Sequence, residues 1–377
     1  MTVTFYSNFF NDHQLPFCEE MYKLLGDGFT FVATEPISKE RLAMGFEDKS
    51  RNYPFILNEY ENEINSKKAY ELRLSSDIVI VGSAPDLYLR DRVLNGKLTF
   101  RYSERFFKKG KWRILDPRVA FAHYKGSFRY RKFKNLYMLC ASAYTSSDCR
   151  FIHSYPDRMY KWGYFTRANK HDMDILTHKV NDYVKILWAG RLIKWKHPEI
   201  PILIINKLIE NDYKVKLDII GNGQLENNLK HMVSKYNLSE YVNFLGSMSP
   251  DNVLKNMEKA DIFLFTSDRQ EGWGVVLNES MSSSCAVVAN RSIGSVPFLI
   301  KNGENGLMYN GTTNDLLKKV ESVVKDIDYC RRLGSNAYKT MHNEWSPEIA
   351  AERLVAFCKE LLDGRVLNFD NGPMSKA

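Results

Sequence analysis

The sequence of 377 residues contains no apolar run of about 18 residues, the minimum for a membrane-spanning helix. Its first residues lack a basic segment followed by a long apolar stretch, so we expect no secretory leader. Internal repeats and low-complexity segments are also missing. These absences favour a folded, soluble protein without a transmembrane helix.

None of the six cysteines lies in a C-x-x-C pair or at a spacing typical of a zinc site. In a chain of this size, we expect them to be lone buried thiols. Such thiols fit a reducing cytoplasm, where disulfides are rare. The cysteines therefore indicate a cytoplasmic protein.

The length suggests about two or three domains of roughly 150 residues each. Short apolar runs alternate with helix-like segments in both halves, which predicts parallel sheets with helices on both faces. In the first half we expect strands near residues 2–6, 29–33, 77–82 and 98–102, and an apolar helix over 135–147 that leads into a further strand. The second half repeats the alternation more regularly, from the strand 184–189 to the helix 347–362.

These patterns predict two doubly wound Rossmann-like domains. The first covers residues 1–166, and the polar stretch 167–182 is the expected linker, although it could be one long surface loop inside a single domain. The second covers residues 183–345. Residues 346–377 would form a helix that crosses back to the first domain and a polar tail that frays.

The clearest motif is EGWGVVLNE at residues 271–279, which follows the apolar run DIFLF and opens a predicted helix. Gly272 and Gly274 let backbone amides approach a ligand, and a helix N-terminus presents free N–H groups to a phosphate. Glu271 and Glu279 could then accept hydrogen bonds from sugar hydroxyls. The alternative is an ordinary strand–turn–helix with one capping acid.

This segment resembles the E-x7-E motif of the retaining glycosyltransferases of family 4, the group 1 glycosyltransferases with the GT-B fold. Further segments stand in the order that the family shows: G-R-L…K at 190–196, G-x-G at 221–223, F-L-G at 244–246 and W-S-P at 345–347. The resemblance covers roughly residues 184–362. It implies an α/β protein of GT-B fold, with two Rossmann-like domains facing across a cleft.

The resemblance also implies roles in binding a nucleotide diphosphate sugar, the donor. Arg191 and Lys196 would grip the diphosphate, whose negative charge grows as the glycosidic bond breaks; the alternative is a solvated pair after a strand. Glu279 would hold the ribose hydroxyls, and Glu271 the hydroxyls of the transferred sugar. The other predicted donor-binding residues are Gly190, Gly221, Gly223, Gly246, Ser247, Gly272, Trp273, Gly274 and Val275.

The first half resembles the family less, because the stretch SNFFNDHQ at 7–14 lacks the family's glycine-rich turn. His13 is our candidate there for an acceptor or phosphate contact, or else a cap of the next helix. Glu104 follows a predicted strand and stands nearest the place where the family often has a histidine beside the reacting carbon. The alternative for Glu104 is an ion pair with a neighbouring arginine.

We expect no metal and no cofactor, because the resemblance implies cationic side chains where other transferases use a divalent ion. The strings at 172–174 and 326–328 match D-x-D, but neither follows a predicted strand.

The implied reaction is glycosyl transfer with retention, by front-side displacement in which the departing phosphate helps to deprotonate the acceptor. The predicted catalytic residues are Arg191, Lys196, Glu271, Glu104 and His13. Two other classes stay open. One is a nucleotide-sugar epimerase or hydrolase of the same architecture. The other is a nucleic-acid-binding protein, which would explain the net charge of +8 but not the E-x7-E segment.

Residues 105–134 carry eleven lysines and arginines and a single acid, Asp116, interleaved with aromatic residues. Such a segment favours an anionic partner, and its aromatics favour a membrane surface. We therefore expect a glycan or polyprenyl-pyrophosphate-linked acceptor at the inner face of the cytoplasmic membrane. That acceptor points to bacterial capsule, exopolysaccharide or lipopolysaccharide assembly. The alternative is a solvated surface whose aromatics belong to the core.

Overall fold

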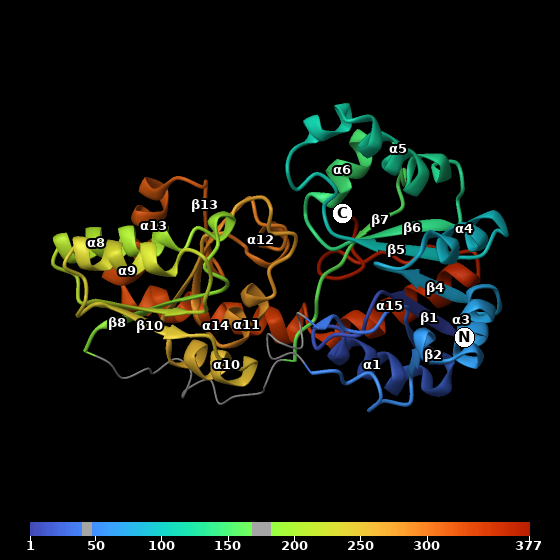
Figure 1. The fold of residues 1–377 in the computed structure, drawn as a ribbon, viewed down its shortest axis with the longest axis horizontal. Helices are drawn as coiled ribbons and strands as arrows, with labels where there is room; N and C mark the ends of the chain where they lie inside the picture. The colour runs from blue at the N-terminus through green and yellow to red at the C-terminus, as the bar shows by residue number, and fades with distance from the viewer. Residues whose placement is uncertain (40–46, 168–181) are drawn as a thin grey trace. The chain divides into compact units, whose positions relative to one another are not determined.

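The computed structural model describes residues 1–39, 47–167 and 182–377. They fall into two compact units (Figure 1). Unit 1 comprises residues 1–167 and 345–377, and unit 2 comprises residues 168–344. The predicted linker at 167–182 lies, apart from its two ends, outside the described residues.

Unit 1 is built on a parallel sheet of seven strands in the order β3-β2-β1-β4-β5-β6-β7. The strands are β1 (Val3–Ser7), β2 (Phe29–Ala33), β3 (Ile56–Asn58), β4 (Ile78–Val81), β5 (Thr99–Ser103), β6 (Leu136–Cys140) and β7 (Met159–Lys161). The helices are α1 (Leu15–Leu25), α3 (Glu63–Ser75), α4 (Asp86–Leu94), α5 (Pro117–Gly126), α6 (Thr145–Phe151) and α15 (Pro347–Leu362). All four residues of β4 are buried, as expected for a central strand covered on both faces.

The helix predicted over residues 135–147 is wrong. The chain there forms β6, between β5 and β7, and only then enters α6. A short apolar run buried on both faces has no period that separates a strand from a helix. The sheet partners on both sides decide the outcome, because they take up the backbone hydrogen bonds of residues 136–140.

The end of the chain packs on unit 1. Phe357 of α15 lies with its ring centroid 4.6 Å from that of Tyr160 on β7. Beyond the helix, the N–H of Lys161 donates to the carbonyl of Ser375 at 2.7 Å, and Met374 is fully buried. The expectation of a frayed tail is therefore wrong for its last residues, because they cover the open edge of β7.

Unit 2 carries a parallel sheet of six strands in the order β10-β9-β8-β11-β12-β13. The strands are β8 (Val184–Ala189), β9 (Val215–Ile220), β10 (Val242–Gly246), β11 (Ile262–Phe265), β12 (Ala286–Asn290) and β13 (Leu307–Tyr309). The helices are α8 (Glu199–Glu210), α9 (Glu226–Lys235), α10 (Pro250–Lys259), α11 (Val276–Ser282), α12 (Val296–Leu299), α13 (Thr313–Lys325) and α14 (Ile327–Asn343). This strand order is that of a doubly wound Rossmann sheet.

The six cysteines are buried free thiols, which confirms the expectation of lone thiols. Among the described residues, no helix combines the length and the apolar character needed to cross a bilayer.

Met374→Ala tests the packing of the tail. Loss of this buried side chain should lower the free energy of unfolding of unit 1 by about 2–4 kcal/mol, through lost burial and a residual cavity. The control Val366→Ala truncates an exposed residue of the same tail and should cost less than about 0.5 kcal/mol. Urea unfolding measures both, and equally small effects would contradict a packed tail.

Candidate active site

The strand order of unit 2 reverses between β8 and β11, which lie side by side at the centre of the sheet. Ligands of such sheets bind at this point, outside the carboxyl ends of the strands. The chain leaves β8 through Gly190 and Arg191 into the short helix η5 (Lys194–Lys196). It leaves β11 into the loop that carries Glu271. The topology thus brings together two motifs that are far apart in the sequence.

Lys196 and Glu271 form an ion pair at this point. The Nζ of Lys196 donates to Oε2 of Glu271 at 2.7 Å, and each side chain is only 12% exposed. The hydroxyl of Ser267 donates to the same oxygen at 3.0 Å. Within the described residues, every hydrogen bond shown for this carboxylate reaches Oε2. Oε1 therefore keeps its capacity to accept a hydrogen bond from a ligand.

The hydroxyl of Thr266 joins the two loops that carry this pair. It accepts a hydrogen bond from the buried indole N–H of Trp188 at 2.9 Å and lies 2.8 Å from the carbonyl of Lys196, to which it donates. One side chain thereby fixes the end of β8 and the backbone of Lys196 against the end of β11.

A second connection runs through Asp268 and His197. The N–H of Asp268 donates to the carbonyl of Trp195 at 2.9 Å. Nδ1 of His197 lies 2.9 Å from a carboxylate oxygen of Glu199, and its Nε2 lies 3.7 Å from Oδ2 of Asp268. Glu199, and to a smaller extent Asp268, raise the pKa of His197. The loops after β8 and β11 are thus connected through backbone and side chains alike.

Arg191 differs from Lys196 in being exposed. The structure shows no partner for its guanidinium among the described residues, so its charge is available to an anion. Gly190 makes room for the neighbouring lysine, because a Cβ there would lie 3.2 Å from Cδ of Lys196.

The glycines of the G-x-G turn are required by backbone packing. Gly221 has a φ of 127°, and a Cβ on it would stand 1.9 Å from the carbonyl oxygen of Gly190. A Cβ on Gly223 would stand 2.6 Å from the carbonyl oxygen of Leu192. Without these side chains the two segments approach closely, and the N–H groups of Gly190 and Leu192 donate to the carbonyls of Ile220 and Asn222 at 3.0 and 2.8 Å. Gly246 and Ser247 are exposed at the end of β10, next to this turn.

In the E-G-W-G turn at residues 271–274, the tryptophan side chain and the backbone have different roles. Trp273 is 1% exposed, and its indole N–H donates to the side-chain oxygen of Asn278 at 2.8 Å. Its side chain therefore belongs to the core, and only its backbone could contact a ligand. Gly274 has a φ of 83°, and a Cβ there would come within 2.3 Å of Phe265. Val275 follows as the residue before α11.

Glu279 lies in the first turn of α11, and burial raises its pKa to about 7. The part of the chain that the structure describes offers no hydrogen bond to its carboxylate. An acid without a partner in such surroundings is a candidate to receive hydroxyl groups, because they would stabilise its charged form.

The predicted residues of unit 1 have local partners. Glu104 follows β5 and accepts hydrogen bonds from Nζ of Lys108 at 2.5 Å and from the hydroxyl of Tyr164 at 3.2 Å. An ion pair is therefore present, but with a lysine instead of an arginine. The N–H of His13 donates to the side chain of Asn11, while the N-cap position of α1 belongs to Gln14.

Asp326, the first residue of the second D-x-D string, has a structural role. It caps α14, accepting a hydrogen bond from the N–H of Tyr329 at 2.9 Å. The other string, at 172–174, lies outside the described residues.

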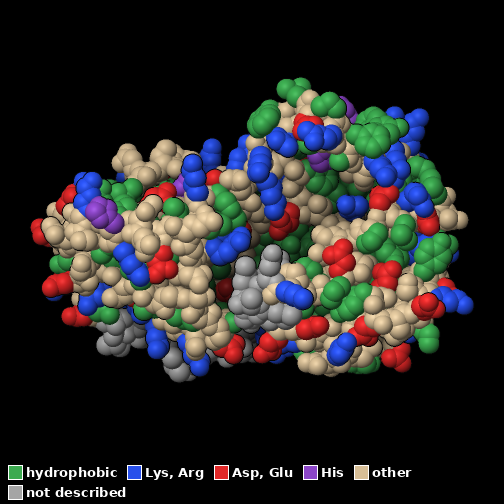
Figure 2. All heavy atoms as spheres, in the orientation of Figure 1, with side chains coloured by type: hydrophobic (Ala, Val, Ile, Leu, Met, Phe, Trp, Pro, Cys, Tyr) green, Lys and Arg blue, Asp and Glu red, His purple; other side chains and the backbone are tan. Residues whose placement is uncertain are grey.

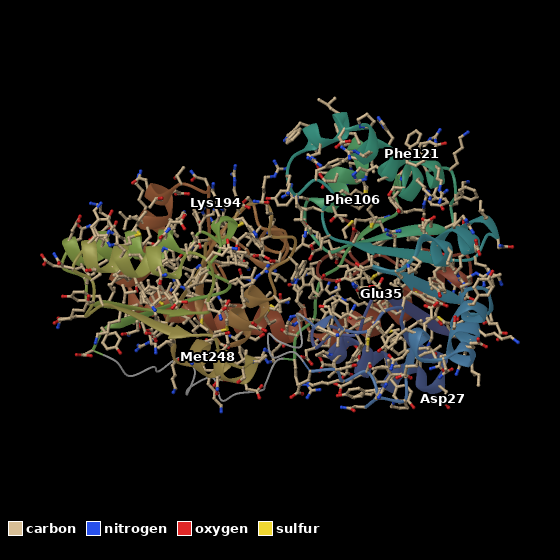
Figure 3. All side chains as sticks on the ribbon, in the orientation of Figure 1. Asp27, Glu35, Phe106, Phe121, Lys194 and Met248 are labelled. Carbon is tan, nitrogen blue, oxygen red and sulfur yellow. The ribbon has the colours of Figure 1, made fainter. Side chains whose placement is uncertain are left out.

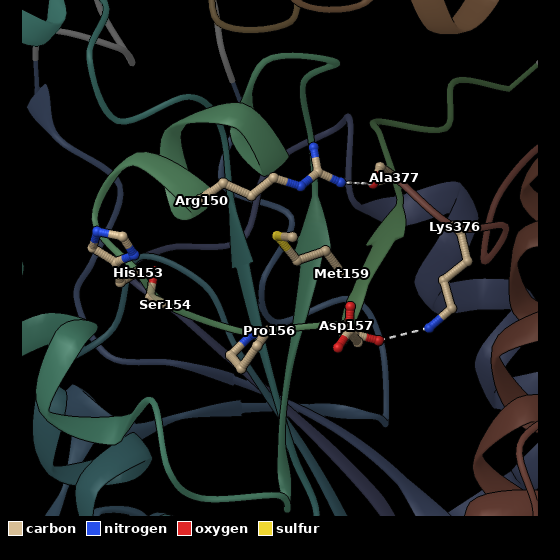
Figure 4. Close-up of a pocket in the computed structure, with 8 residues that line it drawn as sticks. All are labelled: Arg150, His153, Ser154, Pro156, Asp157, Met159, Lys376 and Ala377. Atoms are coloured by element: carbon tan, nitrogen blue, oxygen red, sulfur yellow. Dashed lines mark hydrogen bonds between the residues drawn. The ribbon is translucent and has the colours of Figure 1, made fainter.

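A cavity of about 540 Å³ lies beside β7 in unit 1 (Figure 4) and contains none of the predicted site residues. Its cations are already engaged: Arg150 donates to the carbonyl of Ala377 at 2.9 Å, and Lys376 to that of Asp157 at 2.7 Å. The cavity therefore lies where the end of the chain packs against the sheet of unit 1.

Known proteins resemble the part of the chain that carries this site. Residues 174–340 match the family model of group 1 glycosyl transferases. The capsular polysaccharide biosynthesis glycosyltransferase CapM of Staphylococcus aureus is 26% identical over 179 residues, 47% of this chain and 46% of that protein. An N-acetylgalactosamine-N,N'-diacetylbacillosaminyl-diphospho-undecaprenol 4-alpha-N-acetylgalactosaminyltransferase of Campylobacter jejuni is 33% identical over 156 residues, 41% of each chain. The chain spans about half the length of the curated relatives it matches.

The fold is GT-B. The structure of Anabaena Alr3699/HepE in complex with UDP superposes with a TM-score of 0.67, covering 97% of this chain and 100% of that chain at 15% identity. At this identity the likeness establishes the fold alone. It confirms the fold class predicted from the sequence.

Sequence reasoning missed the residues that hold the site together, namely Thr266, Ser267, Asp268 and His197. The available signal was the polar string TSD directly after the buried strand β11, since such positions lie at the ligand-binding edge of the sheet.

Thr266→Val tests the junction between the loops. It removes the hydroxyl while nearly keeping the shape, so the buried Trp188 donor loses its acceptor. We expect the free energy of unfolding of unit 2 to fall by about 1–3 kcal/mol. Thr266→Ser keeps the hydroxyl and should recover most of that loss. Chemical unfolding compares the two, and equal effects would exclude the hydroxyl as the cause.

Glu279→Gln tests the raised pKa. Between its ordinary value of 4.5 and about 7, the folded protein holds a proton that the unfolded chain releases. The free energy of unfolding of the wild type therefore falls as pH rises through this window. Glutamine does not titrate, so the free energy of unfolding of the variant should rise relative to that of the wild type by roughly 1–3 kcal/mol as the pH increases from 4.5 to about 7. Above that pH the difference should stay constant. Unfolding measured from pH 4 to pH 8 checks this, and a constant difference would mean an ordinary pKa.

Proposed function

We propose that this protein is a glycosyltransferase that transfers a sugar, with retention, from a nucleotide diphosphate sugar to a glycan acceptor. The observation that carries the proposal is the Lys196–Glu271 pair at the strand-order reversal of unit 2, with Arg191 exposed beside it. The match of residues 174–340 to group 1 glycosyl transferases supports it.

In this proposal Arg191 and Lys196 bind the diphosphate. Lys196 donates one of its three protons to Glu271 and keeps the others for phosphate oxygens. Arg191 offers a planar fork suited to two phosphate oxygens at once. Together they stabilise the charge that develops on the leaving nucleoside diphosphate. The transfer would then proceed without a metal ion or cofactor.

The two acids would bind hydroxyl groups of the donor. Glu271 has Oε1 unengaged and an orientation fixed by Lys196 and Ser267, which suits a hydroxyl of the transferred sugar. Glu279 would accept hydrogen bonds from the ribose hydroxyls, and its ionised form accepts them more strongly than its protonated form. Because burial raises its pKa to about 7, donor affinity should weaken below that pH.

The proposed acceptor is a lipid-linked glycan at the inner face of the cytoplasmic membrane, used in bacterial surface polysaccharide synthesis. The names of the relatives support it: one acts in capsular polysaccharide biosynthesis, and the other carries a diphospho-undecaprenol substrate in its name. We further propose that two residues of unit 1, Glu104 and His13, contact the acceptor.

The test is a thermal-shift screen with UDP, GDP, ADP and their sugar conjugates. One nucleotide should raise the melting temperature of the wild type, because ligand binding stabilises the folded state. Arg191→Ala should abolish the shift. The control Lys194→Ala removes an exposed cation of the adjacent η5 (Figure 3) and should keep it.

Turnover with the identified donor completes the test. Arg191→Ala should lower kcat/KM by about 10²–10³-fold, and excess chelator should leave the wild-type rate unchanged. The absence of any shift at millimolar ligand would contradict the donor site. Sugar release without an acceptor would favour a hydrolase.

A further inference from the structure

An unusual concentration of apolar side chains lies exposed on unit 1. Trp112 and Leu115 of the short helix η3 (Lys111–Leu115) are 64% and 81% exposed. Phe121 and Tyr124 of α5 are 63% and 53% exposed. Isolated exposed apolar residues are common, but four within thirteen residues form a patch of the kind that marks an interaction site.

The fold separates these residues from the aromatics that belong to the core. Residues 105–134 form the basic segment that contains this patch. Within it, Phe107 and Tyr130 are buried, and Phe106 packs against the core of unit 1. His123 faces inward from α5, with its ring centroid 4.8 Å from that of Phe107. The helix thus presents Phe121 and Tyr124 away from the core. Figure 3 labels Phe106 and Phe121.

Cations surround the exposed apolar residues. Arg118 and Lys125 are exposed on α5 beside them, and Figure 2 shows basic and apolar side chains gathered over this part of unit 1. The one acid of the segment, Asp116, is engaged: it caps α5 through the N–H of Arg118 and lies 3.6 Å from Nε of the same residue. The patch is therefore apolar and positively charged.

We propose that this α5 face, formed by Trp112, Leu115, Arg118, Phe121, Tyr124 and Lys125, docks on the surface of an anionic lipid bilayer. Aromatic residues prefer the interface between headgroups and acyl chains, and lysines and arginines beside them bind anionic headgroups. The docking goes beyond the proposed transfer reaction and does not depend on the donor site.

A bilayer fits this face better than a nucleic acid does. Leu115 is the most exposed apolar residue of the patch and has no ring on which a base could stack. Inserted at the level of the headgroups, the same side chain loses its contact with water. Both ligands would attract the cations, but only the bilayer also uses the aliphatic residue.

Vesicle flotation without nucleotide sugar tests the proposal. The wild type should float with vesicles of phosphatidylcholine mixed with phosphatidylglycerol and much less with phosphatidylcholine alone. The double variant Leu115→Ser/Phe121→Ser should reduce partitioning about tenfold. The matched control Ile64→Ser/Leu94→Ser removes apolar residues of similar exposure from α3 and α4 and should float like the wild type.

Arg118→Glu/Lys125→Glu tests the charges and should abolish the preference for the anionic vesicles. Melting curves establish that each variant is folded, and a nucleotide shift retained by the Leu115→Ser/Phe121→Ser variant separates docking from donor binding. Equal flotation of that variant and the wild type would overturn the proposal. So would wild-type binding to single-stranded DNA in the absence of vesicle binding.

Discussion

The candidate site depends on the contact between the loops that follow β8 and β11. Strand order makes those loops neighbours, and the hydroxyl of Thr266 fixes them by binding the indole of Trp188 and the carbonyl of Lys196. Without this junction and the backbone bond from Asp268 to Trp195, Lys196 and Glu271 would stand on two independent loops. Their ion pair would then cost side-chain entropy that a surface contact rarely recovers. With them, the pair is held in place before any ligand arrives.

The charges of the site are arranged so that little is left uncompensated without a ligand. Lys196 and Glu271 neutralise each other at low exposure, and burial raises the pKa of Glu279 to about 7, so that below this pH its protonated form predominates. Arg191 carries its charge in solvent, where it costs little. In the proposed donor complex the diphosphate would bind the exposed Arg191. The ribose would then supply Glu279 with the hydrogen bonds that it lacks.

Unit 1 combines a well-packed chain end with an exposed apolar face on α5. Its sheet is completed by the chain end, where Met374 is buried and the backbone of Ser375 covers β7. Its α5 face instead leaves Leu115 and Phe121 in solvent beside cations. Exposed apolar residues are common singly, but four within thirteen residues are not, and the α5 face is therefore the surface that we propose for a partner.

The sequence by itself determined the alternation of buried strands and helices that predicts two Rossmann-like domains, because those patterns are local. The GT-B fold came from the resemblance of its motifs to those of a known family. The sequence also marked the E-x7-E segment, whose residue types are unusual together. It could not determine that residues 136–140 form a strand, nor which aromatics of residues 105–134 are exposed, because both depend on neighbours distant in the chain. The role of Thr266 was invisible for the same reason: its partners, Trp188 and Lys196, reach it only when the sheet is assembled.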